Sequence, residues 1–272
     1  MRRARLTTAC TALTLSAALA AAPPAPKPGY AVGHVLTAAG KPITAPGAKI
    51  ILAIDGVGTQ TAQRLEYRVA VRPDGSYEQK LAEGTYHYFS AQVQVPFGGK
   101  SFLLPLDPVG DDKADRDSTQ GIVQDYVWKV SGAKPGKGDE TKPGDWYGAA
   151  VSLTYDAYRT DLHKSVPPPP AGSKCVFTLT PKGKLIDGSD GKPLTYTRPY
   201  SSLLSTLENG YLADVPVGAY TISGVEVGPD GAKKPLLFRQ GNSAYAESLE
   251  FQFEPATSWA GTRSLGFTRS AN

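Results

Sequence analysis

Cysteine is nearly absent from this sequence, and its scarcity restricts how the chain can be stabilised. The 272 residues contain two cysteines, and Cys10 lies in the N-terminal segment. Cys175 then has no partner for an intramolecular disulfide. It alternates with Phe177 and Leu179, which predicts a buried structural thiol rather than a nucleophile. A hydrophobic core, and not disulfide bonds, must therefore hold the fold together.

Histidine is equally scarce, with three residues at positions 34, 87 and 163. None is followed three residues later by glutamate, so the His-x-x-Glu pair of a zinc peptidase is missing. His-Glu-x-x-His and Gly-x-Ser-x-Gly are also missing, which argues against zinc peptidases and nucleophile-elbow hydrolases. We therefore predict a protein that is not an enzyme and that carries no cofactor.

Long apolar runs are lacking except at the N-terminus. Residues 1–22 combine a positive start (Arg2, Arg3 and Arg5) with an apolar segment over 6–22. That segment is about 17 residues long, rich in alanine, and meets two prolines, which favours a cleaved secretory signal peptide over a membrane anchor. We expect a Pro-rich leader at 23–29. The mature protein is then secreted, or resides in the periplasm or cell envelope, without a transmembrane segment.

A large net charge is lacking as well once the signal is removed. The chain has 29 Lys and Arg against 25 Asp and Glu, and three of the arginines belong to the signal, which leaves 26 against 25. No basic patch with interleaved aromatic residues occurs. We therefore do not expect nucleic acid as a partner.

Short alternating runs, separated by Gly, Pro and Asp turns, make up the rest of the sequence. GAKIILAID (47–55) places alternate apolar residues on one face, and YRVAVRPDGSYEQKL (67–81) forms two such runs around Pro-Asp-Gly. Alternation with a period of two, bounded by turn residues, is typical of β-strands. The pattern predicts an all-β protein.

An internal repeat indicates two domains. Residues 75–104 align without gaps to 209–238, so that Tyr77, Gly84 and Tyr86 recur 134 positions later as Tyr211, Gly218 and Tyr220. Two unrelated β-hairpins can look alike, but a constant offset over thirty residues favours duplication. We predict β-sandwich modules at 30–132 and 146–256, an exposed linker at 133–145 and a flexible tail at 257–272.

The first module carries a family pattern. GHVLTAAGKPI (33–43) and PDGSYEQKLAEGTYHY (73–88) place glycines and tyrosines at recurring turn and strand positions, and Thr44–Pro46 lengthens one gap. This segment resembles the bacterial carboxypeptidase-regulatory-like domain. The resemblance implies a transthyretin-like β-sandwich, related to carbohydrate-binding-like folds, that is not itself a peptidase.

An acidic loop is one candidate site. DPVGDDKADRDS (107–118) contains Asp111, Asp112, Asp115 and Asp117 close together, but the spacing of a calcium-binding loop is missing. A solvated loop is the simpler interpretation, and weak calcium binding is the alternative.

Aromatic residues after the linker are the other candidate site. Trp146 and Tyr147, with Tyr155 and Tyr158, could stack against the faces of sugar rings. Packing at the domain junction is the competing role. We therefore expect a module that binds a glycan or cell-wall polymer if these rings are exposed. If they are buried, we expect a structural or protein-interaction module of the cell envelope that docks through sheet edges.

Overall fold

The computed structural model describes residues 24–43, 47–57, 64–111, 113–200, 210–256 and 260–270. The predicted signal peptide lies outside these residues. The regular structure of the described part is almost entirely β, which confirms the all-β prediction. In the same residues no helix is both long and apolar enough to cross a membrane.

The first half of the chain forms one nine-stranded sheet, in the order β3-β2-β5-β6-β9-β1-β4 with β7 and β8 paired at its side. The end strands β3 and β4 also lie near each other, so the sheet curls around its core. Its strands are β1 (Tyr30–Thr37), β2 (Lys49–Val57), β3 (Arg64–Ala70), β4 (Ser76–Lys80), β5 (Thr85–Phe97), β6 (Lys100–Pro108), β7 (Arg116–Asp117), β8 (Ile122–Val123) and β9 (Tyr126–Trp128).

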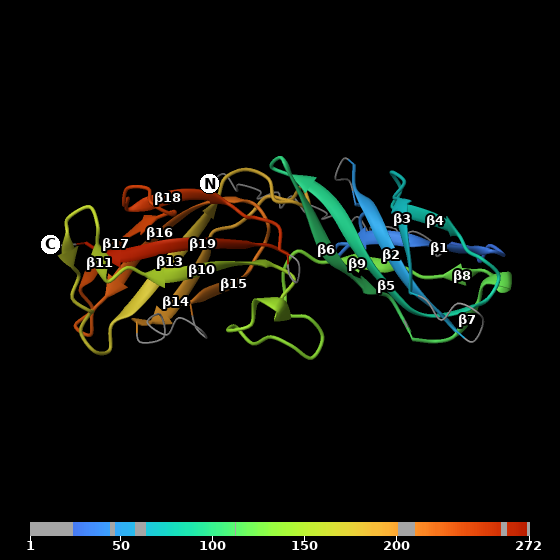
Figure 1. Ribbon diagram of the computed structural model, residues 1–272, viewed down its shortest axis with the longest axis horizontal. Helices are drawn as coiled ribbons and strands as arrows, with labels where there is room; N and C mark the ends of the chain where they lie inside the picture. The colour runs from blue at the N-terminus through green and yellow to red at the C-terminus, as the bar shows by residue number, and fades with distance from the viewer. Residues whose placement is uncertain are drawn as a thin grey trace, which may run out of the picture.

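The second half forms a separate eight-stranded sheet, in the order β14-β13-β16-β17-β19-β10-β15 with β18 paired to β16. The two sheets follow one another along the long axis of the molecule (Figure 1). The strands are β10 (Ala149–Tyr155), β13 (Lys174–Pro181), β14 (Leu194–Pro199), β15 (Tyr211–Val215), β16 (Ala219–Val227), β17 (Lys233–Arg239), β18 (Ser248–Gln252) and β19 (Thr262–Arg269). A short hairpin of β11 (Tyr158–Arg159) and β12 (Lys164–Ser165) stands apart.

The two sheets share one topology. Seven strands form the main path of each sheet, and when these seven are numbered along the chain, both sheets have the order 3-2-5-6-7-1-4. The first and last strands pair in parallel in both sheets, β1 with β9 and β10 with β19. Duplication of one module would produce this shared order of seven strands.

A tyrosine contact also recurs at the predicted offset. The hydroxyl of Tyr86 donates to the carbonyl of Ala82 at 3.0 Å, and the hydroxyl of Tyr220 donates to that of Pro216 at 2.8 Å. Each tyrosine thus ties a strand start to the backbone four residues upstream, as corner tyrosines do in other β-sandwiches.

The constant offset ends inside β5, where a β-bulge adds one residue: Asp55 pairs with His87 but Ala53 with Ser90, whereas β13 and β16 pair without a shift. The turn of the hairpin adds a second difference. Val93 on β5 pairs with Leu104, whereas Val227 on β16 pairs with Lys233. The first hairpin continues outward and turns through two glycines, but the second turns through the longer segment 228–232. The ungapped alignment beyond His87 and Thr221 therefore joins residues that do not occupy equivalent positions.

The predicted flexible tail is wrong for most of its described length. Thr262–Arg269 is β19, which lies between β17 and β10 inside the second sheet. Leu265 and Phe267 are 2% and 0% exposed, because they alternate around Gly266 onto the core face. The local pattern of this strand is only two apolar side chains two residues apart. Pairing with β17 and β10 accounts for the rest of the strand.

The predicted linker is exposed along much of its length, yet it is a closed loop and not an extended spacer. Ala133 and Trp146 form a β-bridge at its base. The Lys134 side chain donates to the carbonyl of Gly144 at 2.7 Å, and a short 3₁₀ turn covers Pro143–Asp145. The ends of the loop therefore meet, which brings the two sheets into contact.

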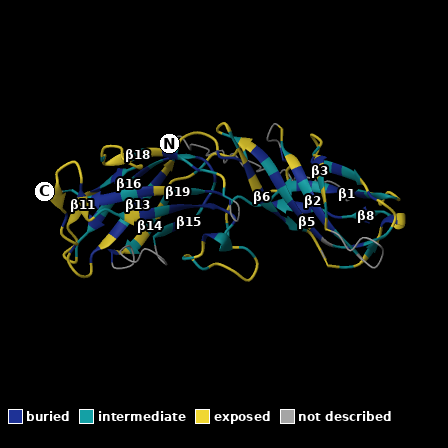
Figure 2. Ribbon diagram, in the orientation of Figure 1, coloured by how far each residue is buried: buried dark blue, intermediate teal, exposed yellow. Residues whose placement is uncertain are grey.

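The cores follow the predicted alternation, since buried positions alternate with more exposed ones along the strands (Figure 2). Cys175, Phe177 and Leu179 are all 0% exposed, and burial raises the pKa of the Cys175 thiol to about 12. Trp128 is buried as well. The thiol is thus a core group and is not activated.

Candidate ligand-binding site

Trp146 is half-buried and lies against the second sheet. Its indole nitrogen donates to the carbonyl of Asp139 at 3.0 Å, and its ring lines a cavity of about 290 Å³. The charged side chains in that cavity are already paired, since Arg198 and Glu140 form an ion pair at 2.8 Å and Asp214 accepts backbone N–H groups. The surroundings of Trp146 therefore serve mainly to hold the loop to the sheet.

Tyr147 is 3% exposed and offers no ring face to a ligand. Its hydroxyl donates to the carboxylate of Asp107 on the first sheet, and burial together with this bond raises the pKa of Tyr147. Lys129 bonds the same carboxylate at 2.6 Å and lies 5.1 Å from the centre of the tyrosine ring. Tyr147 thus belongs to the junction between the sheets. The prediction that its ring stacks against a sugar is wrong, because the ring is buried.

Tyr155 and Tyr158 lie at the other end of the second sheet. The half-buried Tyr155 ring packs edge-on against Tyr200 and Phe267, with centroids 5.1 and 5.5 Å away. Tyr158 begins the β11–β12 hairpin and is 48% exposed. The four predicted aromatic residues are therefore divided between two ends of the module and form no common platform.

The acidic loop holds no metal-like arrangement in the part that the structure describes. Asp112 lies outside that part, and no group of three His, Cys, Asp or Glu side chains within it could hold an ion. Asp111 accepts the N–H of Lys113 at 2.8 Å, Asp117 accepts that of Thr119 at 2.8 Å, and Asp115 faces His87. The described carboxylates thus fix the turns of their own loop.

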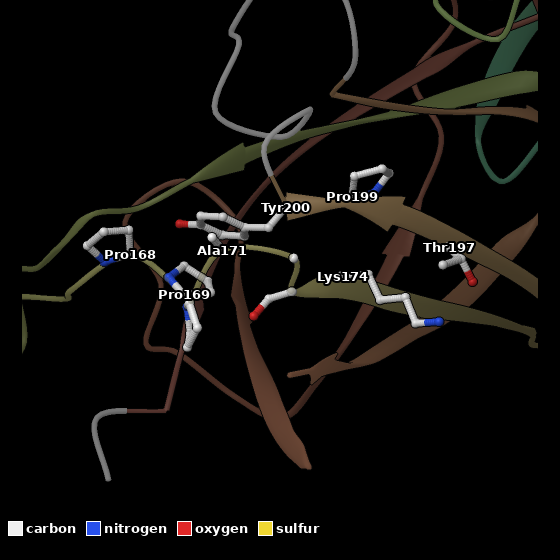
Figure 3. A pocket seen from close by; sticks show the side chains of 10 residues that line it. Pro168, Pro169, Ala171, Lys174, Thr197, Pro199 and Tyr200 are labelled. Atoms are coloured by element: carbon white, nitrogen blue, oxygen red, sulfur yellow. The ribbon is translucent and has the colours of Figure 1, made fainter. Parts of the chain in front are cut away.

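A pocket beside the four consecutive prolines is the site that the sequence did not indicate. It measures about 470 Å³, within the usual size range of ligand sites. Its walls are mainly apolar, and its lining residues are Pro168, Pro169, Pro170, Ala171, Gly172, Ser173, Lys174, Thr197, Pro199 and Tyr200. Figure 3 shows the Tyr200 ring extending over Pro169 and Ala171 toward Pro168, with Lys174 and Thr197 on the other side. We call this the proline pocket.

Local chain geometry builds the proline pocket. Consecutive prolines favour an extended, left-handed conformation and cannot pair within a sheet, so the segment stays outside the strands. The N–H of Ser173 then donates to the carbonyl of Pro170 at 3.1 Å, and the N–H of Tyr200 donates to that of Ser173 at 3.0 Å. These two bonds hold the proline segment and the end of β14 on opposite sides of the cavity.

Two exposed polar side chains and one residue with a buried hydroxyl line the proline pocket. Lys174 and Thr197 are exposed and their side chains make no hydrogen bond or ion pair within the described residues. Ser173 is 4% exposed, and its hydroxyl has no hydrogen-bond partner there either. A buried hydroxyl without a partner is costly, and a bound hydroxyl or carbonyl group would satisfy it. Tyr200 is buried, which raises its pKa and keeps its hydroxyl neutral.

Comparison with known proteins leaves the family open. No family model and no curated protein matches the chain. Among solved structures, it is similar to the Bacillus anthracis TIE protein with 12% identity and a TM-score of 0.35, covering 89% of this chain and 34% of that one. The chain thus spans about a third of the length of that protein.

Two smaller bacterial proteins are also similar. A DUF3823 family protein from Bacteroides uniformis has 10% identity and a TM-score of 0.22, covering 83% of this chain and 99% of that chain. The shaft pilin of Lactobacillus rhamnosus GG has 10% identity and a TM-score of 0.24, covering 90% and 100%. Such distant matches carry no argument about function, and the carboxypeptidase-regulatory-like resemblance has no matching family model behind it.

Proposed function

We propose that this chain is a non-enzymatic, exported binding module that holds a glycan or cell-wall polymer in the proline pocket. The observation that carries the proposal is the buried Ser173 hydroxyl, which lacks a partner and lines an open, mainly apolar cavity. Sugar rings present apolar C–H faces beside hydroxyl groups, so their recognition combines flat apolar walls with a few polar contacts. Proline rings and Tyr200 supply the walls, and Lys174, Thr197 and Ser173 supply the contacts.

A structural or protein-interaction role is the second candidate, and the buried Tyr147 at the junction favours it. A polar contact links the two modules, since Asp107 accepts hydrogen bonds from Tyr147 and Lys129. A structural protein of the cell envelope would need such a fixed junction. Strand addition at the edge strand β14 is disfavoured, however, because Pro193 precedes this strand and Pro199 ends it. Proline and charge on an edge strand oppose pairing with another chain.

The test is retention of residues 23–272 on purified cell wall and on a panel of insoluble polysaccharides. We expect at least one polymer to retain the protein, and Lys174→Ala combined with Thr197→Ala to weaken binding about tenfold, which corresponds to about 1.4 kcal/mol. The matched control is Lys192→Ala combined with Thr180→Ala, which removes an exposed lysine and threonine outside the pocket.

Trp146→Ala separates the two candidate cavities. Retention that this substitution abolishes, while the Lys174 and Thr197 pair has no effect, would move the site to the Trp146 cavity. Absence of retention on every polymer would overturn the glycan proposal and leave the interaction role.

Ser173→Ala provides an independent check with two opposite effects. Removing a buried hydroxyl that lacks a partner should stabilise the free protein by about 1 kcal/mol, measured by urea unfolding. The same change should weaken polymer binding, because the ligand loses a hydrogen-bond partner. Destabilisation of the free protein would contradict the unpartnered state of this hydroxyl.

A further inference from the structure

A second cavity, of about 280 Å³, adjoins the other side of the proline segment. Pro167 lines this cavity, whereas Pro168 lines the proline pocket. Its lining is strongly basic, with Arg159, Lys164, Lys234 and Arg269 among the residues that border it. We call it the basic pocket.

The two arginines of the basic pocket are fixed in place. Arg269 donates to both carboxylate oxygens of the buried Glu226, and its remaining nitrogen donates to the carbonyl of Pro167 at 3.0 Å. Arg159 is 7% exposed and donates to both oxygens of Asp161. Each arginine thus has one carboxylate partner and a rigid position, and the Arg269 bond to Pro167 ties the basic pocket to the proline segment.

The two lysines of the basic pocket have no such partners. Lys164 and Lys234 are exposed, and neither forms a hydrogen bond or ion pair with the described residues. The carboxylates of Asp161 and Glu226 neutralise the two arginines. The positive charges of the two lysines remain uncompensated among the described residues.

We propose that the basic pocket binds an oxyanion, and that this oxyanion is the acidic group of a polysaccharide whose neighbouring ring lies in the proline pocket. This inference rests on the proposed function and specifies its ligand as an acidic glycan. Ammonium groups bind phosphate and carboxylate oxygens through charge-assisted hydrogen bonds, and the fixed arginines add positive potential in a partly enclosed space. Phosphate and carboxylate share this chemistry, so the first measurement below uses phosphate as a probe and the second uses a polymer that carries carboxylates.

The first measurement uses inorganic phosphate as the probe and the amide signals of ¹⁵N-labelled protein as the readout. Saturable shifts are expected at Lys164, Ser165, Lys234 and Ser270, and Lys164→Ala combined with Lys234→Ala should weaken the affinity about tenfold. The control, Lys80→Ala combined with Lys192→Ala, removes the same charge from exposed lysines that line neither pocket. An unchanged response in the Lys164 and Lys234 variant, or an equal loss in the control, would overturn the proposal.

The second measurement compares polygalacturonate with its methyl ester, which has the same sugar backbone without the charge. Preference for the acid form should disappear in the Lys164 and Lys234 variant and persist in the control. Binding of phosphate with no retention on cell wall or on any polymer of the panel would sustain the anion site and sink the proposed function. Equal binding of both polymers, unaffected by the lysine substitutions, would sustain the function and sink the anion site. Phosphate binding with a preference for neutral polymer would contradict the acidic ligand.

Discussion

Gly33→Ala is expected to destabilise the protein by about 3 kcal/mol, because the first sheet leaves no room for a side chain at this position. A Cβ atom on Gly33 would lie 1.9 Å from the carbonyl oxygen of Gln124 and 2.8 Å from the Tyr77 ring. The same carbonyl accepts the buried Tyr77 hydroxyl at 2.6 Å, so neither group can move without breaking that bond. The strand β1 must therefore shift away from its neighbours.

Thermal unfolding measures this effect. For a protein of this size, about 3 kcal/mol corresponds to a fall in Tm of about 6–12 °C. Gly144→Ala is the matched control, since a Cβ atom there meets nothing within 4 Å and its φ is not in the left-handed region. Equal melting temperatures for the two variants would show that the close approach at Gly33 is not structurally required.

Asp214→Ala is expected to cost about 3 kcal/mol at the junction of the two modules. The Asp214 carboxylate accepts the N–H of Gly132 at 2.8 Å and that of Gly148 at 3.2 Å, on either side of the closed loop. Alanine would leave both donors without this acceptor. It would also have to adopt φ near 59°, which alanine tolerates poorly and asparagine tolerates better. Asp214→Asn, which keeps an acceptor, should therefore cost clearly less in urea unfolding, and equal losses would contradict the bonding role.

The same carboxylate predicts a pH dependence. Burial raises the pKa of Asp214 above its ordinary value, although the N–H groups of Gly132 and Gly148 oppose the shift. The stability that this group contributes is fully present below its unfolded pKa and is lost as pH rises through its folded pKa. Measured against Asp214→Asn, wild-type stability should thus decline as pH rises through the carboxyl range. A relative increase over that range would contradict the sign.

Local patterns in the sequence predicted the strands that carry strong alternation. Cys175, Phe177 and Leu179 are buried as expected, and the repeated tyrosines Tyr86 and Tyr220 make equivalent backbone contacts. The strand at Thr262–Arg269 was missed because its alternation is short and is broken by Gly266. Its position depends on pairing with strands far away in sequence, and no local pattern records such pairing.

The candidate site was harder to predict for a similar reason. The proline pocket joins Pro168–Pro170 to Tyr200, which lies thirty residues later and comes close only through the pairing of β13 with β14. The one available signal was the run of four prolines directly before a strand. The aromatic residues of the sequence, by contrast, suggested a site at Trp146 and Tyr147. Trp146 bonds Asp139 within the closed loop, and Tyr147 bonds Asp107 of the first sheet, and neither contact can be seen in the sequence.

Hydrogen exchange of the whole protein, with and without a polymer that retains it, tests the central claim most directly. Bound polymer is expected to slow exchange in the segments that border the proline pocket, 171–175 and 194–200, and to leave the loop at 133–147 unchanged. Protection confined to the loop at 133–147, with none beside the prolines, would contradict a ligand site in the proline pocket.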